Sequence, residues 1–428
     1  MNILLYAILV ILPLPLFTLI LRHRHYKNYL LPFVALVGIY IFNIVGSWSV
    51  INDEQLFTNL YYYSLLAIIV AFYLFYLFIF ASGRTLYINW TSLNYNTTDR
   101  QIIVPFLVLL WGFSFFMFFL YYSRHGLPAV FDLSFSEHVK FYDVRAEKST
   151  DLPEGMHWYS LGFNTIPAFI FCITYIMKRL ISSQGVKILF YLNLPLVLFF
   201  SALTMHKTPF AYLVLYMLLI KFLLSPMSFN IKKLIGYMAV IIGSIIVFVR
   251  IYLLDRGLMD VFIYLPEYFF NRVFACYTRA HAYMILIFPN QNDFFNGLTF
   301  INPGGIFPFE PISLPQFLGY WVEGRLSNYP PPSFSQAYAN FGTAGFALSL
   351  LIMFTQIIIL QIIFKKCPKT PLFLALYSLV IPMMLGYSMQ SIDTVIGVIF
   401  VIFVMIILSI YYVFRDLWST LFITKRII

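Results

Sequence analysis

The chain has 428 residues, of which 61% are hydrophobic and only 10% are charged, and its formal net charge is +10. About a quarter of the residues of a soluble domain are usually charged, so this composition excludes an ordinary soluble domain and indicates a membrane protein. The positive charge calls for an explanation, because a basic chain can attract nucleic acid, a membrane surface or an anionic substrate.

The hydrophobic residues fall in runs of roughly 20, the length that an α-helix needs to cross a hydrocarbon core about 30 Å thick. Backbone groups in lipid must be paired within the protein, and continuous apolar runs achieve this as helices. We therefore predict an all-α polytopic membrane protein that forms one integral membrane domain, 1–428, with about eleven transmembrane helices. In chain order these helices cover 2–21, 29–50, 59–81, 102–122, 158–177, 188–205, 209–225, 234–253, 341–364, 371–389 and 394–414.

Basic residues concentrate on one side of this arrangement. Of the 27 Lys and Arg residues, 17 lie in the segments 22–28, 82–101, 178–187, 221–233, 365–370 and 415–428. Cytoplasmic segments of membrane proteins are rich in Lys and Arg, so we predict that these six segments and the C-terminus are cytoplasmic and that the N-terminus lies outside. The net charge then needs no nucleic acid as a partner.

Two long segments, 123–157 and 254–340, form large loops on the outer side in this arrangement. Long loops on a compact protein are usually functional, so we expect the chemistry on the outer face. The second loop contains strong helix signals at 260–287, followed by a stretch rich in Gly and Pro. The chain shows no ATP-binding or metal-binding motif, and we predict no cofactor and no metal site.

The second loop returns to the membrane through the sequence PPPSFSQAYANFGTAGF, which begins at Pro330. Three successive prolines favour extended backbone, and Ser333 or Ser335 is predicted to cap a helix that continues into the span 341–364. Gly342 and Gly345 are predicted to let another backbone segment approach closely.

The segment PPSFSQAYANFGTAGF resembles the re-entry motif of Wzy-type O-antigen and oligosaccharide repeat-unit polymerases. The matching residues are Tyr338, Asn340, Phe341, Gly342 and Gly345. Gln336 stands where the family pattern has Glu, which speaks against an acid or base role at this position. MHKTPFAYLVLYMLL resembles the start of a central span and places Lys207 there, and NRVFACYTRAHAYMILIF resembles an arginine-bearing periplasmic helix. The double Arg-x10-Gly motifs of some members are not evident.

The resemblance implies an enzyme of the bacterial inner membrane with a helical fold similar to that of GT-C glycosyltransferases. Such polymerases act at the periplasmic face. They transfer a growing glycan from undecaprenyl pyrophosphate onto another lipid-linked repeat unit and release undecaprenyl pyrophosphate. The expected partners are this lipid-linked oligosaccharide, the surrounding lipids and a chain-length regulator protein. No nucleotide sugar or ATP is required.

Arg272 and Arg279 are the predicted catalytic residues. On a regular helix they share one face with Tyr283, because a spacing of seven residues closes about two turns. Arginine binds phosphate through two parallel hydrogen bonds, and a fixed cation stabilises the charge that develops on a departing pyrophosphate. The alternative is that these arginines pair with acidic residues of the same loop, such as Glu267 or Asp260.

His281 is a candidate general base, because its side chain titrates near neutral pH. On a regular helix it lies about 200° around the axis from Arg279 and so faces elsewhere. Lys207 and Arg250 are candidate phosphate-binding residues, with snorkelling to the lipid headgroups as the alternative.

Further candidate substrate-binding residues are Tyr283, Gln336, Tyr338 and Asn340, near the outer membrane surface. The aromatic residues of this region, which include Trp321 and Tyr329, either offer flat rings to sugars or belong to the interfacial aromatic belt. The sequence leaves both interpretations open.

Three other functions compete with polymerisation. Another GT-C-type transferase acting on polyprenyl-linked sugars would place an acidic residue on its first outer loop, where this chain has Asp53 and Glu54. An O-antigen ligase would differ in its acceptor. A lipid-linked oligosaccharide flippase would not be an enzyme, but the long loop 254–340 argues against it.

Overall fold

The protein is described by a computed structural model, in which every described element of secondary structure is a helix. The description covers residues 2–22, 29–82, 88–90, 93, 97–126, 159, 161–203, 207–225, 263, 267, 270–300, 308–324 and 329–387. The chain divides into two compact units, which we describe separately. Unit 1 contains residues 1–89, 232–367 and 380–428, and unit 2 contains 90–231 and 368–379.

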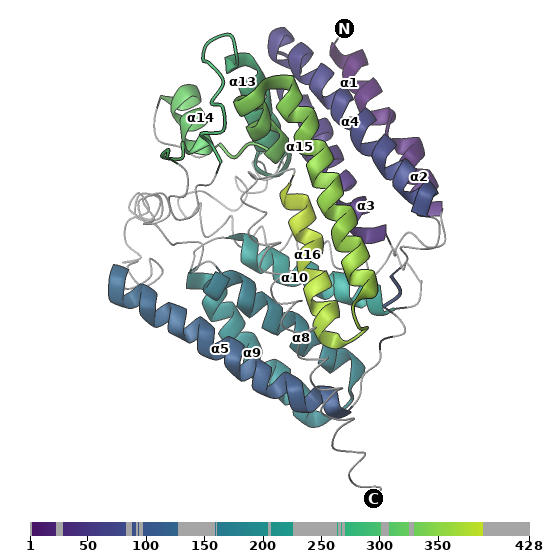
Figure 1. Cartoon of the computed structure of the whole chain (residues 1–428), viewed down its shortest axis with the longest axis vertical. Coiled ribbons are helices and arrows are strands. Elements are labelled where there is room, and N and C mark those ends of the chain that lie inside the picture. Colours follow the sequence, from purple (N-terminus) through teal and green to yellow (C-terminus); the bar gives the residue numbers. More distant parts are fainter. Residues whose placement is uncertain are drawn as a thin grey trace, which may run out of the picture. The chain divides into compact units, whose positions relative to one another are not determined.

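The N-terminal part of unit 1 contains helices that pack side by side (Figure 1). They are α1 (Asn2–Ile11), α2 (Leu14–Arg22), α3 (Leu30–Ile39), the π-helical turn η2 (Tyr40–Ile44), the 3-10 turn η3 (Val45–Val50) and α4 (Glu54–Ser82). The run 2–21, predicted as one helix, is broken between α1 and α2 at Pro13. Proline lacks the N–H that a helix interior requires and restricts the residue before it, which explains the break.

The second part of unit 1 comes from the segment 254–340, which was predicted to be a long loop, and from the helix that follows it. It contains the π-helical turn η6 (Asn271–Ala275), α13 (Cys276–Ile287), α14 (Leu314–Glu323) and α15 (Ser333–Lys366). Residues 271–287 are thus helical, which confirms the later part of the helix predicted at 260–287. Helix α14 was not predicted, although a proline in its first turn and Gly324 after its end are typical helix boundaries.

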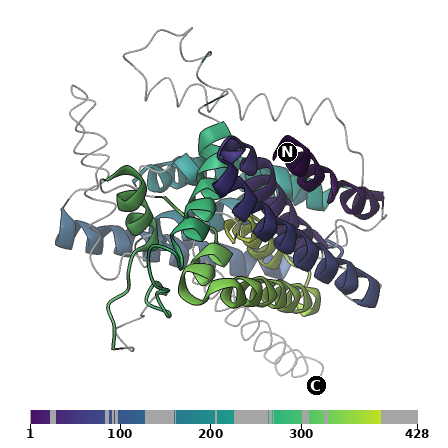
Figure 2. The ribbon, with the colours of Figure 1, turned by 90° about the horizontal axis from the view of Figure 1, so that it is seen from above.

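Helix α13 packs against η3, α4 and α15. Figure 2 shows this teal-green helix next to the purple N-terminal helices and the light-green α15. Thr278 in α13 donates a hydrogen bond of 2.5 Å to the carbonyl oxygen of Phe42 in η2. A Cβ atom added to Gly46 would overlap both the Thr278 hydroxyl and the Phe274 carbonyl. Glycine at position 46 therefore allows η3 to contact α13 closely.

Helix α15 is kinked near its start. Phe341 and Gly342 have non-helical backbone angles, and Gly342 has φ 64° and ψ −152°, a conformation open essentially only to glycine. The kink leaves the carbonyl oxygens of Ala339 and Asn340 free to accept other hydrogen bonds. They accept them from the N–H groups of Phe295 and Asn296, at 3.0 and 3.2 Å. The kink therefore provides two backbone acceptors that bind the loop that follows α13.

Two predictions concern the start of α15: close backbone approach at Gly342 and Gly345, and capping of the helix by a serine. The predicted approach of another backbone segment is not what the structure shows: an added Cβ at Gly345 would overlap the carbonyl oxygen of Ala337 in the first part of α15, and the nearest group to Gly342 is the ring of Phe294. The predicted serine caps are wrong, because the residue before the helix is Pro332 and no side chain caps it. Ser333 instead donates a hydrogen bond of 2.7 Å to the carbonyl oxygen of Tyr387, and Ser335 pairs with His281.

Unit 2 is built from α5 (Thr97–His125), η5 (Leu161–Thr165), α8 (Ile166–Leu180), α9 (Gln184–Leu203) and α10 (Lys207–Leu224). Helix α8 packs against α5, α9 and α10. Aromatic residues fill the core near the end of α5, where Tyr121, Phe163 and Phe200 are buried together. Trp111 in α5 donates a hydrogen bond of 2.5 Å to Asn193 in α9, which pairs a polar group that would otherwise lie in apolar surroundings.

Among the described residues, six helices are long and apolar enough to cross a membrane, which supports a membrane-spanning protein. They are Leu30–Val50, Glu54–Phe75, Ile103–Arg124, Leu161–Leu180, Gln184–Leu203 and Ser333–Lys366, and each coincides with a predicted span. The predicted spans 2–21, 209–225 and 371–389 coincide with shorter apolar helices, the last of them α16 (Pro371–Gly386). The spans 234–253 and 394–414, and most of the predicted loop 123–157, lie outside the described residues.

Candidate functional site

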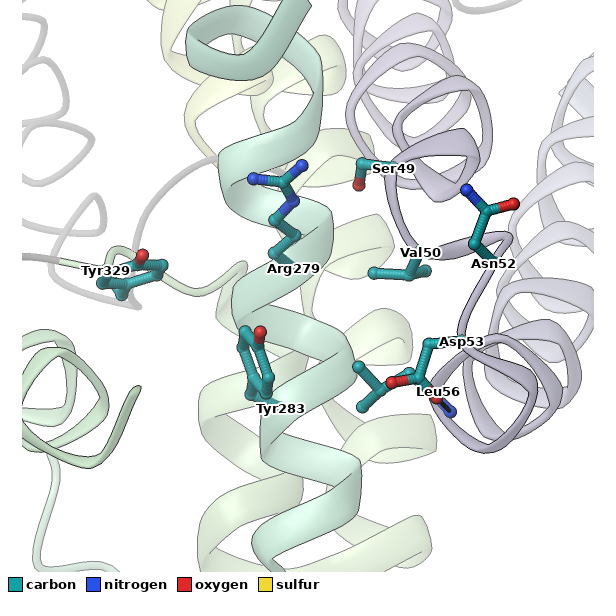
Figure 3. Close-up of a pocket in the computed structure, with 8 residues that line it drawn as sticks. All are labelled: Ser49, Val50, Asn52, Asp53, Leu56, Arg279, Tyr283 and Tyr329. Carbon is teal, nitrogen blue, oxygen red and sulfur yellow. Dashed lines mark hydrogen bonds between the residues drawn. The ribbon is translucent and has the colours of Figure 1, made fainter. Parts of the chain in front are cut away.

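A pocket of about 530 Å³ opens on unit 1 where the segment from Ser49 to Leu56 meets α13. Figure 3 shows Arg279 and Tyr283 projecting from the same side of α13, with the segment from Ser49 to Leu56 on one flank and Tyr329 on the other. The lining residues are Ser49, Val50, Asn52, Asp53, Leu56, Arg279, Tyr283 and Tyr329. The pocket thus combines a guanidinium group, a carboxylate, an amide and phenols.

Arg279 is the cationic group of this pocket, and its side chain is partly buried. Its Nη2 atom donates a hydrogen bond of 3.3 Å to Oδ1 of Asn271, eight residues earlier. The amide oxygen of Asn271 is uncharged, so this contact orients the guanidinium group without neutralising it. An oriented cation at the wall of an open pocket is suited to bind an anion.

The π-helical turn η6 changes the register between Arg272 and Arg279. A π turn holds more residues than an α turn, so residues on either side of it no longer follow the spacing of 100° per residue. The contact between Arg279 and Asn271 reflects this change, because residues eight apart on a regular α-helix lie about 80° from each other. The shared face predicted for the two arginines assumed a regular helix. It stays a prediction, since the side chain of Arg272 lies outside the described residues.

Asp53 supplies the carboxylate of the pocket. Its Oδ1 atom accepts a hydrogen bond of 2.9 Å from the N–H of Leu56, so Asp53 is the N-cap of α4. The same side chain is exposed and lines the pocket that contains Arg279. Sequence reasoning had considered Asp53 only for the competing GT-C transferase. The available signal was an acidic residue before a helix, which by itself indicates only a cap.

Tyr283 and Tyr329 form the aromatic part of the lining. Tyr283 lies one turn after Arg279 on α13, as the sequence predicted for a residue of this site. Tyr329 comes from the segment before α15, and its phenol donates a hydrogen bond of 2.8 Å to Oε1 of Glu323 at the end of α14. Burial and this hydrogen bond raise the pKa of Tyr329 to about 12, so its phenol stays protonated and continues to donate.

His281 faces the interior of unit 1, away from the pocket. Its side chain is only 1% exposed, and its Nδ1 atom lies 2.5 Å from Oγ of Ser335. The rings of Tyr63, Phe334 and Phe346 surround the imidazole. Burial lowers the pKa of His281 to about 3, so the imidazole is neutral at physiological pH. The expectation that His281 points away from Arg279 is confirmed, and its surroundings leave no room for a substrate.

Gln336, Tyr338 and Asn340 are also buried, so they do not line the pocket. Gln336 donates a hydrogen bond of 2.6 Å to the carbonyl oxygen of Thr299, and Tyr338 donates one of 2.9 Å to the carbonyl oxygen of Phe288. Both partners lie in the loop that follows α13. These residues were predicted to bind substrate, whereas the described contacts show them holding this loop against α15.

Asn340 makes the most complete set of these contacts. Its Oδ1 atom accepts hydrogen bonds from the N–H groups of Gly297 and Thr299, at 2.7 and 3.5 Å. Its Nδ2 atom donates to the hydroxyl of Thr299 at 2.5 Å and to the carbonyl oxygen of Gln336 at 2.8 Å. All four hydrogen-bonding positions of the amide are therefore used within the protein. A substrate could bind Asn340 only by breaking one of these contacts.

Lys207 and Arg250 are the remaining candidates for binding phosphate. Lys207 begins helix α10, but its side chain lies outside the described residues. Arg250 lies outside the described residues altogether. Their predicted role in phosphate binding stays a prediction. Comparisons of the chain with models of protein families, with curated proteins and with solved structures found no match.

Proposed function

We propose that this protein is a membrane glycosyltransferase that polymerises undecaprenyl-pyrophosphate-linked oligosaccharide repeat units at the outer face of the bacterial inner membrane. The observation that carries the proposal is the pocket in which Arg279 lies with Asp53 and two tyrosines. The resemblance of the segment 331–346 to the re-entry motif of Wzy-type polymerases supports the same reaction. O-antigen or a similar surface polysaccharide is the product.

In this mechanism Arg279 binds the pyrophosphate of the donor. A hydroxyl oxygen of the acceptor sugar attacks the anomeric carbon of the donor glycan, and the bond between that carbon and the pyrophosphate oxygen breaks. Undecaprenyl pyrophosphate leaves with the bonding electron pair, and Arg279 stabilises the growing negative charge. Arg272 joins Arg279 in this role if both arginines reach the same ligand.

Asp53 accepts the proton that the attacking hydroxyl loses and passes it to water. A carboxylate is a suitable base when it lies within hydrogen-bonding reach of the hydroxyl. One oxygen of Asp53 caps α4, which fixes the orientation of the carboxylate and leaves its second oxygen for this role. This assignment replaces the buried His281 as the candidate base.

The same pocket also suits a related enzyme. Asp53 lies on the predicted first outer loop, where a different GT-C-type transferase would place an acidic residue. Such a transferase or an O-antigen ligase would use Asp53 and Arg279 with another acceptor. The polymerase remains the preferred function, since the re-entry motif resembles that family.

Deletion of the gene separates these functions in one gel of the host lipopolysaccharide. Loss of a polymerase leaves lipopolysaccharide with a single repeat unit, whereas loss of a ligase or flippase leaves none on the surface. Complementation with Arg279→Ala should restore no ladder, because loss of a contact to a developing anion slows such reactions by about 10²–10³. Arg279→Lys keeps the charge but loses the forked geometry, so its ladder should remain clearly reduced.

Arg124 provides a matched control, since it is an exposed arginine at the end of α5. Arg124→Ala should restore the full ladder at equal membrane abundance. A full ladder from Arg279→Ala would refute the role of this residue, and a ladder unchanged by gene deletion would refute the polymerase function.

A further inference from the structure

The aromatic side of the pocket continues onto helix α14. The ring of Trp321 lies 6.2 Å from the ring of Tyr283, centroid to centroid, and Trp321 keeps 39% of its surface exposed. Tyr283 itself lines the pocket beside Arg279. Trp321 is not itself a lining residue, so helix α14 places a second exposed ring next to the tyrosine ring that lines the pocket.

Two hydrogen bonds join α14 to Tyr329, a second tyrosine that lines the same pocket. The phenol of Tyr329 donates to Glu323 at the end of α14, and the backbone N–H of Tyr329 donates to the carbonyl oxygen of Pro315 at its start, at 3.1 Å. Both ends of the helix are thus joined to a residue that lines the pocket. We call the rings of Tyr283, Trp321 and Tyr329 the ring wall. Their positions are fixed by the contact between Tyr283 and Trp321 and by the two hydrogen bonds of Tyr329.

The flank opposite Tyr329 is different in character. Ser49, Asn52 and Asp53 supply a hydroxyl, an amide and a carboxylate there, and Asn52 and Asp53 are exposed. A pocket with aromatic rings on one side and polar groups on the other suits a ligand that has both an apolar face and a polar edge. A pyranose ring has both, because its C–H bonds form apolar faces and its hydroxyls form a polar edge.

We propose that the ring wall is a sugar subsite, in which a pyranose of the repeat unit stacks on Tyr283 and Trp321 while its hydroxyls reach Asn52 and Asp53. This inference rests on the proposed function, since it assigns the carbohydrate to one side of the pocket and the pyrophosphate to Arg279. Glu323 is a positioning residue, because it contacts the ring wall through Tyr329.

The competing explanation is that these aromatic residues anchor α14 at the membrane surface, where Trp and Tyr are enriched. The two explanations differ in what Trp321 binds. A sugar subsite loses affinity for carbohydrate when the ring is removed, whereas an interfacial anchor loses affinity for lipid.

The test measures binding of two soluble probes to the purified full-length protein in detergent. One probe is the repeat-unit oligosaccharide released from its lipid carrier by mild acid hydrolysis, and the other is inorganic pyrophosphate. Tyr283→Leu and Trp321→Leu should each weaken oligosaccharide binding about 3- to 10-fold, the size expected for loss of one aromatic stacking contact. Both variants should bind pyrophosphate as the wild type does.

Three further variants complete the design. Tyr283→Phe keeps the ring and should retain most of the oligosaccharide affinity. Arg279→Ala should lose pyrophosphate binding and keep most of the oligosaccharide binding. Tyr62→Leu is the matched control, since Tyr62 is a 64% exposed tyrosine on α4 that lies outside the pocket lining, and it should bind both probes normally.

Equal oligosaccharide affinity in the wild type, Tyr283→Leu and Trp321→Leu would overturn the sugar subsite, as would no binding by the wild type. Unchanged oligosaccharide affinity in Trp321→Leu would leave this tryptophan with the role of a membrane-surface anchor and would also overturn the subsite. Ring-dependent oligosaccharide binding by a protein whose gene deletion leaves the ladder intact would refute polymerisation but not the subsite. The two proposals can therefore fail separately.

Discussion

Asn340 and Thr299 bind each other through two hydrogen bonds in opposite directions. Nδ2 of Asn340 donates to the hydroxyl of Thr299 at 2.5 Å, and Oδ1 of Asn340 accepts from the N–H of Thr299 at 3.5 Å. Both residues are buried. This pair joins the loop after α13 to α15 directly before the kink at Gly342.

Asn340→Ala should destabilise the protein. The substitution removes the acceptor of the partly buried N–H of Gly297 and of the buried N–H of Thr299, and an unpaired buried polar group costs about 1–3 kcal/mol. Thermal unfolding in detergent should show a lower midpoint, and limited proteolysis should cut faster between 290 and 300. Thr355→Ala is the control, because Thr355 is an exposed residue that bonds only to the carbonyl of Leu351 in the described structure. Equal stability of both variants would contradict the role given to Asn340.

Gly342→Ala should destabilise the protein through the backbone. A Cβ atom at φ 64° and ψ −152° is strained, which typically costs about 1–3 kcal/mol, and it would also lie 3.1 Å from the ring of Phe294. Gly112→Ala is the matched control, since no atom lies within 4 Å of the added Cβ and alanine favours the helix. The unfolding midpoint should fall for Gly342→Ala and stay level or rise for Gly112→Ala. An unfolding midpoint of Gly342→Ala equal to that of the wild type would show that the kink does not require glycine.

The stability of the protein should fall as the pH falls below the ordinary pKa of histidine. Burial lowers the pKa of His281 from 6.5 to about 3 in the folded protein, so the unfolded chain takes up the proton first. Between pH 7.5 and 5 this difference removes about 2 kcal/mol of stability. His281→Asn should be less stable at neutral pH but should lose less stability between these two pH values. Parallel pH profiles of the two proteins would show that His281 does not cause the dependence.

Asp53→Asn separates a catalytic role from a structural one. Asparagine caps a helix about as well as aspartate, so this variant keeps the contact with Leu56 and loses only the negative charge. We expect wild-type thermal stability with a strongly reduced lipopolysaccharide ladder. Asp53→Ala should lose both the ladder and about 1 kcal/mol of stability. Glu54→Gln, a change in the exposed neighbour outside the pocket lining, should keep the ladder. A full ladder from Asp53→Asn would leave Asp53 only as a cap.

Reporter fusions test the predicted orientation in the membrane. A fusion after Lys369 should be cytoplasmic and one at Asn292 periplasmic, because 17 of the 27 basic residues lie on the side assigned to the cytoplasm. An alkaline phosphatase and a fluorescent protein reporter should give opposite signals at the two positions. The same location for both fusions would refute the arrangement.

The sequence alone determined where the apolar helices lie, because a run of about 20 apolar residues is a local property. The helices Leu30–Val50 and Gln184–Leu203 match their predicted spans to within a few residues. The end of α13 at Ile287 also agrees with the end of the helix predicted from the helix signals at 260–287. Helix α14 was missed, since it is short and lies in a stretch rich in Gly and Pro.

Only the tertiary structure decided which polar residues meet. Asp53 and Arg279 are far apart in the sequence, and nothing local indicates that the start of α4 and helix α13 bring them to one pocket. Nor does the sequence distinguish the buried Asn340, whose amide is fully bonded to a distant loop, from a residue that binds substrate. Burial and hydrogen-bond partners depend on contacts between distant segments, whereas helix formation depends on neighbours along the chain.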